Sequence, residues 1–206
     1  MMTLINYEDS KVKNNYVEIY GMPASGKTSL VQKMMEDNEL IVDINKELPK
    51  PALSRQVYKI KGIFSYFLSS PVMFINDFII ILLSRQKSIK DLLIVSSNWF
   101  LILYMYRKNK YDEKNIIMWD QGLFQALWSI NFSSRKKLNM TSLLKNKILP
   151  KIVYFIDAED YVLIDRALNR GTFIRLDYNN KNQIIKARES LSLVFEQMKN
   201  VGYSTM

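Results

Sequence analysis

The stretch from Tyr16 to Thr28 constrains the fold most. It opens with the β-branched and aromatic residues of a short strand, continues into Gly21-x-x-x-x-Gly26-Lys27-Thr28 and leads into a predicted helix over 27–36. Such a loop makes an anion cradle of backbone N–H groups, next to the positive end of the helix dipole. A glycine turn that binds nothing is the alternative, and both flanks argue against it. The predicted phosphate-binding residues are Gly21, Pro23, Ala24, Ser25, Gly26, Lys27, Thr28 and Ser29. In this loop type the lysine contacts the terminal phosphates and the Thr28 hydroxyl ligates Mg²⁺.

The amino-acid composition limits the metal-binding and acid–base groups that the protein can use. The 206 residues include no cysteine and no histidine, which excludes disulfides and thiolate metal sites and argues against zinc. Without histidine, acid–base chemistry must use carboxylates, lysine or tyrosine. The net charge of +9 favours anionic partners such as nucleotides, nucleic acid or an acidic membrane surface. The lysines are scattered, however, so their abundance alone explains the charge equally well.

Apolar runs that predict strands alternate with helical patterns along the chain. The predicted strands cover 16–20, 40–44, 115–120 and 151–157, and residues 201–206 could begin another. Residues 1–15 are polar, without the apolar core of a signal peptide, and we expect them to be a poorly ordered lead-in to a cytoplasmic protein. The alternation predicts one α/β domain of three layers with a mostly parallel sheet.

The region 52–110 is helical in pattern and unusually apolar. Pro71 marks a break, and a further helix is predicted over 90–107. Asn76 and Asp77 interrupt the apolar run 64–83, which favours buried helices over a membrane span, although proximity to a membrane stays open. We expect these helices to pack on the sheet and on each other. Their apolar positions at helical intervals include Tyr58, Phe64, Phe67, Phe74, Phe78, Ile81 and Leu82.

Asp120 is the second candidate site residue. It ends the apolar run 115–119, so it should lie at the carboxyl edge of the sheet, where open α/β folds bind ligands. There it could hold Mg²⁺ or accept a proton from an attacking hydroxyl. The alternative is an aspartate that only caps the next helix.

Arg166, Arg170 and Arg175 form the third candidate group. The first two are four residues apart on a predicted helix, so they share a face, and Gly171 then allows a sharp exit. Their guanidinium groups could stabilise a transferring phosphoryl group. A solvated, arginine-rich helix end is the alternative.

A fourth, weaker group follows the predicted strand 40–44, where an acceptor could enter. Asp43 or Glu47 could orient an acceptor hydroxyl, and Arg55 could bind an anionic group of the acceptor. Ordinary surface charge explains these three residues equally well.

Together these features resemble the P-loop small-molecule kinases of the nucleoside and nucleotide kinase superfamily, especially the thymidylate-kinase-like branch. The resemblance rests on Gly21–Thr28, on Trp119-Asp120-Gln121-Gly122, and on the segment from Asp157 to Gly171. It implies a parallel sheet ordered 2-3-1-4-5, with the fifth strand short or missing here, and a lid over about 166–176. It also implies ATP with Mg²⁺ and transfer of the γ-phosphoryl group to a hydroxyl or phosphate of a small acceptor of the nucleoside, nucleotide or sugar type. Gln121 stands where the thymidylate kinases usually carry arginine.

Two other functions stay open. One is a nucleotide-binding switch or regulatory ATPase without a small acceptor, against which the chain lacks Asn-Lys-x-Asp and an Asp-x-x-Gly after the strand 115–120. The other is a polynucleotide kinase or nucleic-acid-binding protein, which the net charge motivates and which would show steep salt dependence. A homodimer also stays open.

Overall fold

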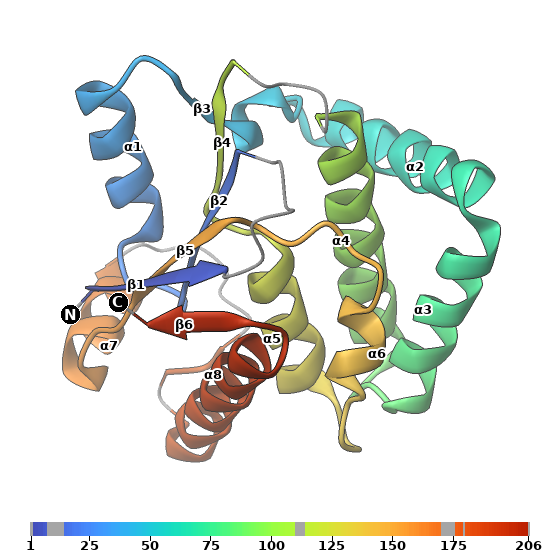
Figure 1. The fold of residues 1–206 in the computed structure, drawn as a ribbon. Coiled ribbons are helices and arrows are strands. Elements are labelled where there is room, and N and C mark those ends of the chain that lie inside the picture. The colour runs from blue at the N-terminus through green and yellow to red at the C-terminus, as the bar shows by residue number, and fades with distance from the viewer. Residues whose placement is uncertain (1, 8–14, 110–113, 170–175, 179, 206) are drawn as a thin grey trace.

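The computed structural model describes residues 2–7, 15–109, 114–169, 176–178 and 180–205 (Figure 1). It is an α/β fold around a mixed sheet of six strands in the order β3-β4-β2-β5-β1-β6. The strands are β1 (Met2–Tyr7), β2 (Tyr16–Gly21), β3 (Ile41–Asp43), β4 (Ile116–Trp119), β5 (Ile152–Ile156) and β6 (Tyr203–Thr205). The predicted α/β class with a mostly parallel sheet is confirmed.

The parallel half of the sheet is β3-β4-β2-β5. Val17 of β2 lies between Met118 of β4 and Ile152 of β5, and all three strand pairs are parallel. The four strands predicted first therefore lie in the predicted order, with β2, which leads into the loop 21–28, near the middle.

The expectation for residues 1–15 is wrong for Met2–Tyr7. This segment is the strand β1, antiparallel to β5 with Met2 opposite Ile156, and it takes the place beside β5 where a fifth parallel strand was expected. The short β6 pairs with the other side of β1. The strand forms because it pairs with β5 and β6 and because Ile5 is buried in the core. Local composition does not reveal this, since both pairing partners lie far along the chain.

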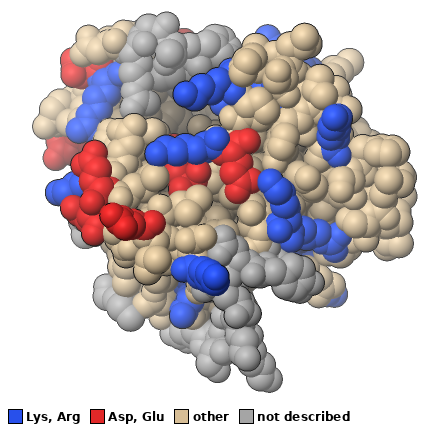
Figure 2. All heavy atoms as spheres, turned by 90° about the horizontal axis from the view of Figure 1, so that it is seen from above, with Lys and Arg blue, Asp and Glu red and all other residues tan. Residues whose placement is uncertain are grey.

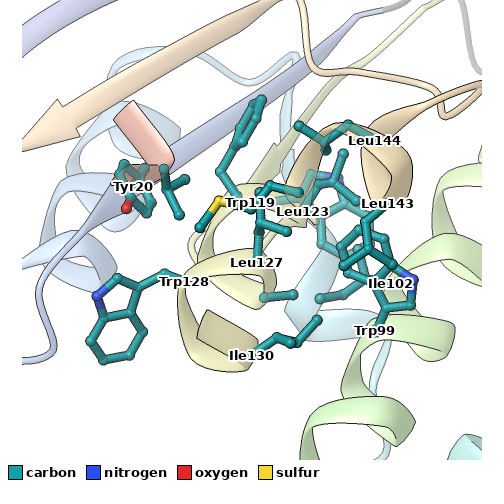
Figure 3. Packing of buried hydrophobic residues seen from close by; sticks show 14 of the residues in the cluster. Tyr20, Trp99, Ile102, Trp119, Leu123, Leu127, Trp128, Ile130, Leu143 and Leu144 are labelled. Carbon is teal, nitrogen blue, oxygen red and sulfur yellow. The ribbon is translucent and has the colours of Figure 1, made fainter. Parts of the chain in front are cut away.

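The two faces of the sheet carry different helices. Val17 and Ile19 of β2 pack with Val31 of α1 (Lys27–Asp37). Tyr16 and Tyr20, the alternate residues of β2, face a larger core. That core joins α4 (Ile89–Lys108), α5 (Leu123–Ser133), α6 (Met140–Leu144) and α8 (Lys181–Asn200). Figure 3 shows its centre, with Trp99 and Ile102 of α4, Leu123 and Leu127 of α5, and Leu143 and Leu144 of α6.

Residues 52–83 form a layer of their own at one side of the molecule, outside α4 (Figure 1). After the short 3₁₀ helix η1 (Ile44–Glu47), α2 (Ala52–Ser69) and α3 (Pro71–Leu83) meet at Ser70 with a bend of 116°. The break at Pro71 is thus confirmed, because proline stands at the start of α3.

The packing expected for these helices is only partly right. The main contacts of α2 and α3 are with α4 and with each other rather than with the sheet, and α4 packs on α5. Phe64, Phe78 and Leu82 are therefore exposed by 60%, 36% and 47%, although their spacing suggested a packed face.

Candidate functional site

The residues 21–28 form a tight loop between β2 and α1. The Ser25 N–H donates to the Met22 carbonyl over 3.2 Å, and the Leu30 N–H donates to the Gly26 carbonyl over 3.1 Å to open the helix. Gly26 has φ 98°, a left-handed conformation that favours glycine. A Cβ on Gly21 would lie 2.3 Å from the Ile156 carbonyl oxygen of β5, so only glycine fits there. Both motif glycines have a structural reason.

The amino end of α1 faces this loop without a side-chain cap among the described residues, and its first turn carries no acidic residue. Thr28 and Ser29 are exposed there. The Ser25 hydroxyl is buried without a hydrogen-bond partner in the described chain. Positive helix-end charge and an unsatisfied hydroxyl make this loop suited to an anion.

Lys27 folds over the loop. Its Nζ donates to the carbonyl oxygens of Gly21 and Met22 over 2.9 and 2.8 Å. The ammonium group therefore lies on the loop itself, within reach of any phosphate that the backbone would hold.

Asp120 connects the loop to the neighbouring strand. Its Oδ2 accepts from the Thr28 hydroxyl over 2.8 Å, and its Oδ1 accepts from Asn45 Nδ2 over 2.6 Å. Asn45 also donates to Asp43 Oδ1, from its backbone N–H over 2.9 Å and from its side chain over 3.0 Å. The structure thus brings Thr28, Asp120 and Asp43 together through Asn45, which sequence reasoning missed and which the Asp43-x-Asn45 spacing of an Asx turn could have suggested.

The surroundings of Asp120 favour its protonated form more than water does. Burial raises the pKa of this carboxyl above its ordinary value, and the nearby Asp43 carboxylate adds to the rise. The hydrogen bonds from Thr28 and Asn45 and the charge of Lys27 oppose it. The result is a carboxylate that gains from a cation or a proton.

Glu18 of β2 lies beneath the loop, fully buried, and was not predicted as a site residue. Its carboxyl accepts from the backbone N–H groups of Gln125 over 2.8 Å and Phe124 over 3.1 Å, at the start of α5. Burial raises its pKa from 4.5 to about 8, against the opposing effect of these hydrogen bonds. A charged residue in the middle of an apolar strand was the signal available in the sequence.

Arg166 is the predicted arginine that the structure places at the loop. It lies on α7 (Asp160–Asn169), and its Nη1 donates to the Ser25 carbonyl over 3.3 Å. Arg170 and Arg175, with most of the predicted lid, lie outside the described residues.

Two further residues support this side of the site and were missed. Arg188 of α8 donates from Nε and Nη2 to Asp160 Oδ1 over 3.0 and 2.8 Å, and from Nη1 to Asp157. It therefore fastens the end of β5 to the start of the helix that carries Arg166. The Tyr178 hydroxyl donates to the Pro23 carbonyl over 2.5 Å and holds the loop from outside.

The three weakly predicted acceptor residues, Asp43, Glu47 and Arg55, do not lie together in the structure. Asp43 belongs to the Asp120 cluster, whereas Glu47 pairs with Lys108 at the end of α4 over 2.8 Å. Arg55 is exposed in the first turns of α2. Within the described chain, no hydrogen bond or ion pair joins Glu47 or Arg55 to Asp120.

An open hollow of about 590 Å³ lies beside the loop. Ser29, Leu30 and Lys33 of α1 line one side, and Ile156 and Arg166 line another. Its volume is in the range of small-molecule sites. Among the described residues, no group of three or more His, Cys, Asp or Glu could hold a metal ion, so a cation here would depend on Thr28 and Asp120 with water or ligand oxygens.

No protein-family model and no curated protein sequence matches this chain.

Proposed function

We propose that this protein is an ATP- and Mg²⁺-dependent small-molecule kinase with the three-layer P-loop fold, which transfers the γ-phosphoryl group to a small acceptor. The observation that carries the proposal is the 2.8 Å hydrogen bond from Thr28 to Asp120. It joins the end of the phosphate loop to the carboxylate that follows the adjacent parallel strand β4. P-loop enzymes use this pair of groups to hold the cation.

The donor set fits Mg²⁺. Both side chains offer oxygen atoms, and Mg²⁺ binds through one or two protein groups while keeping water and phosphate ligands. When bound, it would neutralise charge on the phosphates. Thr28 and Asp120 would hold it, and a raised Asp120 pKa agrees with a carboxylate that awaits a positive partner.

The chain's other groups have complementary roles in this proposal. Lys27 and Arg166 stabilise negative charge on the transferring group, together with Arg170 and Arg175 from the lid. Asp120 orients the acceptor hydroxyl or takes its proton, with Asp43 and Asn45 beside it. The hollow between α1 and Arg166 is large enough for the remainder of the nucleotide.

The test is ADP release by the purified protein with ATP and Mg²⁺, with and without pools of nucleosides, nucleotides, sugars and sugar phosphates. One pool should stimulate release, and Lys27→Ala should abolish the stimulation. Lys145→Ala, an exposed lysine near α6, is the charge-matched control and should behave as the wild type.

Asp120→Asn sharpens the result. It keeps a side chain that can bond Thr28 but removes the charge, so kcat should fall by about 10²–10³-fold, as when other charge-stabilising groups are removed. Nucleotide binding without stimulation by any pool would favour the switch instead. Absence of nucleotide binding would overturn the proposal.

A further inference from the structure

The outer side of α2 carries a continuous stripe of exposed apolar residues. Their spacing of four, three, four and four residues places them on one side of the helix. All five are exposed, from 44% to 79%: Leu53, Val57, Ile60, Phe64 and Leu68.

Exposed apolar residues are also present beyond the bend. On α3 the exposed residues are Val72, Ile75, Phe78, Ile79, Leu82 and Leu83, and the start of α4 adds Ile89 and Leu93. We call these residues and the α2 stripe the outer apolar face. Asp77, the acidic residue of α3, points inward and is fully buried, so it does not interrupt this face.

The outer apolar face is not the packed side of these helices. Gly62 and Tyr66 of α2 and Ile81 of α3 are buried on the inner side. Asp77 accepts from Trp99 Nε1 over 2.9 Å and from Lys147 Nζ over 3.0 Å, which ties α3 to the body of the protein. The helices are thus apolar on two sides, and a globular fold needs only one.

The charge around this face is mainly positive. From Lys50 to Leu93 the chain contains seven basic residues and two acidic ones, the buried Asp77 and Asp91 in the first turn of α4. The basic residues are Lys50, Arg55, Lys59, Lys61, Arg85, Lys87 and Lys90. None of the seven makes an ion pair with a described residue. Lys59 is half-buried and donates to Asn98 of α4 over 3.0 Å, and Lys87 lies over the Phe132 ring, so these two contribute least to the outer charge. In Figure 2 the part of the molecule over α2 and α3 shows basic side chains set among other residues, whereas acidic side chains gather elsewhere in that view.

We propose that α2, α3 and the start of α4 dock on an anionic membrane surface through the outer apolar face. Apolar side chains enter the boundary between headgroups and acyl chains while the lysines and arginines meet the lipid phosphates. A second copy of the chain would bring the same positive charge to this face, so charge complementarity favours the lipid. This inference goes beyond the proposed kinase function and does not depend on it.

The helices lie on the bilayer and do not cross it. Joined, α2 and α3 are long and apolar enough for a span, but they bend by 116° and their inner sides are fastened to α4. The helix α4 is also long and apolar enough to cross a membrane. Half of its apolar segment is buried inside the protein, however, as in the core helix of a globular fold. One-sided docking keeps all of these contacts.

The test is flotation of the full chain with vesicles. Phosphatidylcholine vesicles containing phosphatidylglycerol should carry the protein, pure phosphatidylcholine should carry much less, and salt should weaken the binding. Ile60→Ser with Phe64→Ser should reduce binding at least about tenfold. The control Ile185→Ser with Leu193→Ser, two exposed positions of α8, should bind as the wild type. Lys61→Glu with Lys90→Glu should weaken binding by about fivefold or more per charge.

Thermal unfolding and nucleotide binding of each variant show that the fold is kept, and they separate this test from the kinase assay. Absence of binding to anionic vesicles at low salt would overturn the proposal. An equal loss in the α8 control would do the same. So would a dimer, detected by light scattering, that Ile60→Ser with Phe64→Ser dissociates, because a second copy would then cover the face.

Discussion

The sheet with the loop 21–28 and the helical layer of α2 and α3 are built differently. In the first, charged groups such as Asp120 gather at an edge that is open to a ligand, and the interior is apolar apart from the buried Glu18. In the second, a carboxylate lies inside and apolar residues such as Ile60 and Phe64 face outward. The spacing of apolar residues therefore predicts a helix, but where a helix is apolar on two sides it does not predict which side packs against the rest of the protein.

The two buried aspartates make the same contrast in chemistry. Burial raises the pKa of both Asp77 and Asp120. Asp77 has a permanent cation, because Lys147 lies 3.0 Å away and is itself almost fully buried. Among the described residues, the hydrogen-bond donors to Asp120 are the neutral groups of Thr28 and Asn45, and the positive charge of Lys27 also acts on it. The first aspartate is satisfied by the fold, and the second has capacity left for a ligand.

The largest expected effect is on the satisfied aspartate. Lys147→Met leaves a carboxyl buried without its cation, so the free energy of unfolding should fall by about 3–5 kcal/mol. Urea denaturation measures it. Lys145→Met, two residues away and exposed, should change stability little.

Adding Asp77→Asn to Lys147→Met should restore part of the loss, because the amide keeps an acceptor for Trp99 without a charge. If Lys147→Met alone costs less than about 1 kcal/mol, as surface ion pairs do, the ion pair does not fasten α3, and the contrast between the two aspartates fails.

The two regions also differ in how closely neighbouring atoms surround a glycine, and this difference predicts a smaller effect on stability. A Cβ on Gly122 would lie 2.6 Å from the Glu18 carboxyl carbon, in a buried contact with no room to yield. Gly122→Ala should therefore cost about 1–3 kcal/mol, as overpacking does. A Cβ on Gly62 of α2 would lie 2.8 Å from Tyr104 Cδ1. That half-buried ring can turn, and alanine favours a helix over glycine by about 0.5–1 kcal/mol.

Gly62→Ala should consequently stay within about 1 kcal/mol of the wild type. Denaturant midpoints of both variants check the order of the two effects. Equal losses would mean that the helical layer is packed as rigidly as the sheet.

The most gradual effect is the titration of Glu18, because it is spread over several pH units. Its pKa is raised from 4.5 to about 8 on folding, so its contribution to stability is present below pH 4.5 and is lost as the pH rises through 8. The slope is at most about 1.4 kcal/mol per pH unit. With no histidine in the chain, few other groups titrate in this window.

Glu18→Gln should remove this slope from the curve of unfolding free energy against pH, while Glu196→Gln, an exposed position of α8, should retain it. A flat wild-type curve between pH 5 and 8 would mean that the hydrogen bonds from Phe124 and Gln125 outweigh burial.

Local patterns predicted the four strands of the parallel half of the sheet, the tight turn between β2 and α1 and the break at Pro71, because each depends on neighbours in sequence. The strand β1 and the partners of Asp120 could not be predicted in the same way. Pairing of Met2 with Ile156 and bonding of Asn45 to Asp120 depend on contacts between distant residues. The sequence shows Glu18 as a charged residue within a strand. Its role as hydrogen-bond acceptor for the first N–H groups of α5 depends on the tertiary structure.

The position of β1 has a consequence for folding during synthesis. Of the six strands this one leaves the ribosome before the others, yet its partners are β5 at 152–156 and β6 at 203–205. Gly21 at the end of β2 likewise meets Ile156. The loop 21–28 therefore remains without one of its flanking strands until residue 156 has been translated, and a nascent chain cannot complete the proposed nucleotide site earlier.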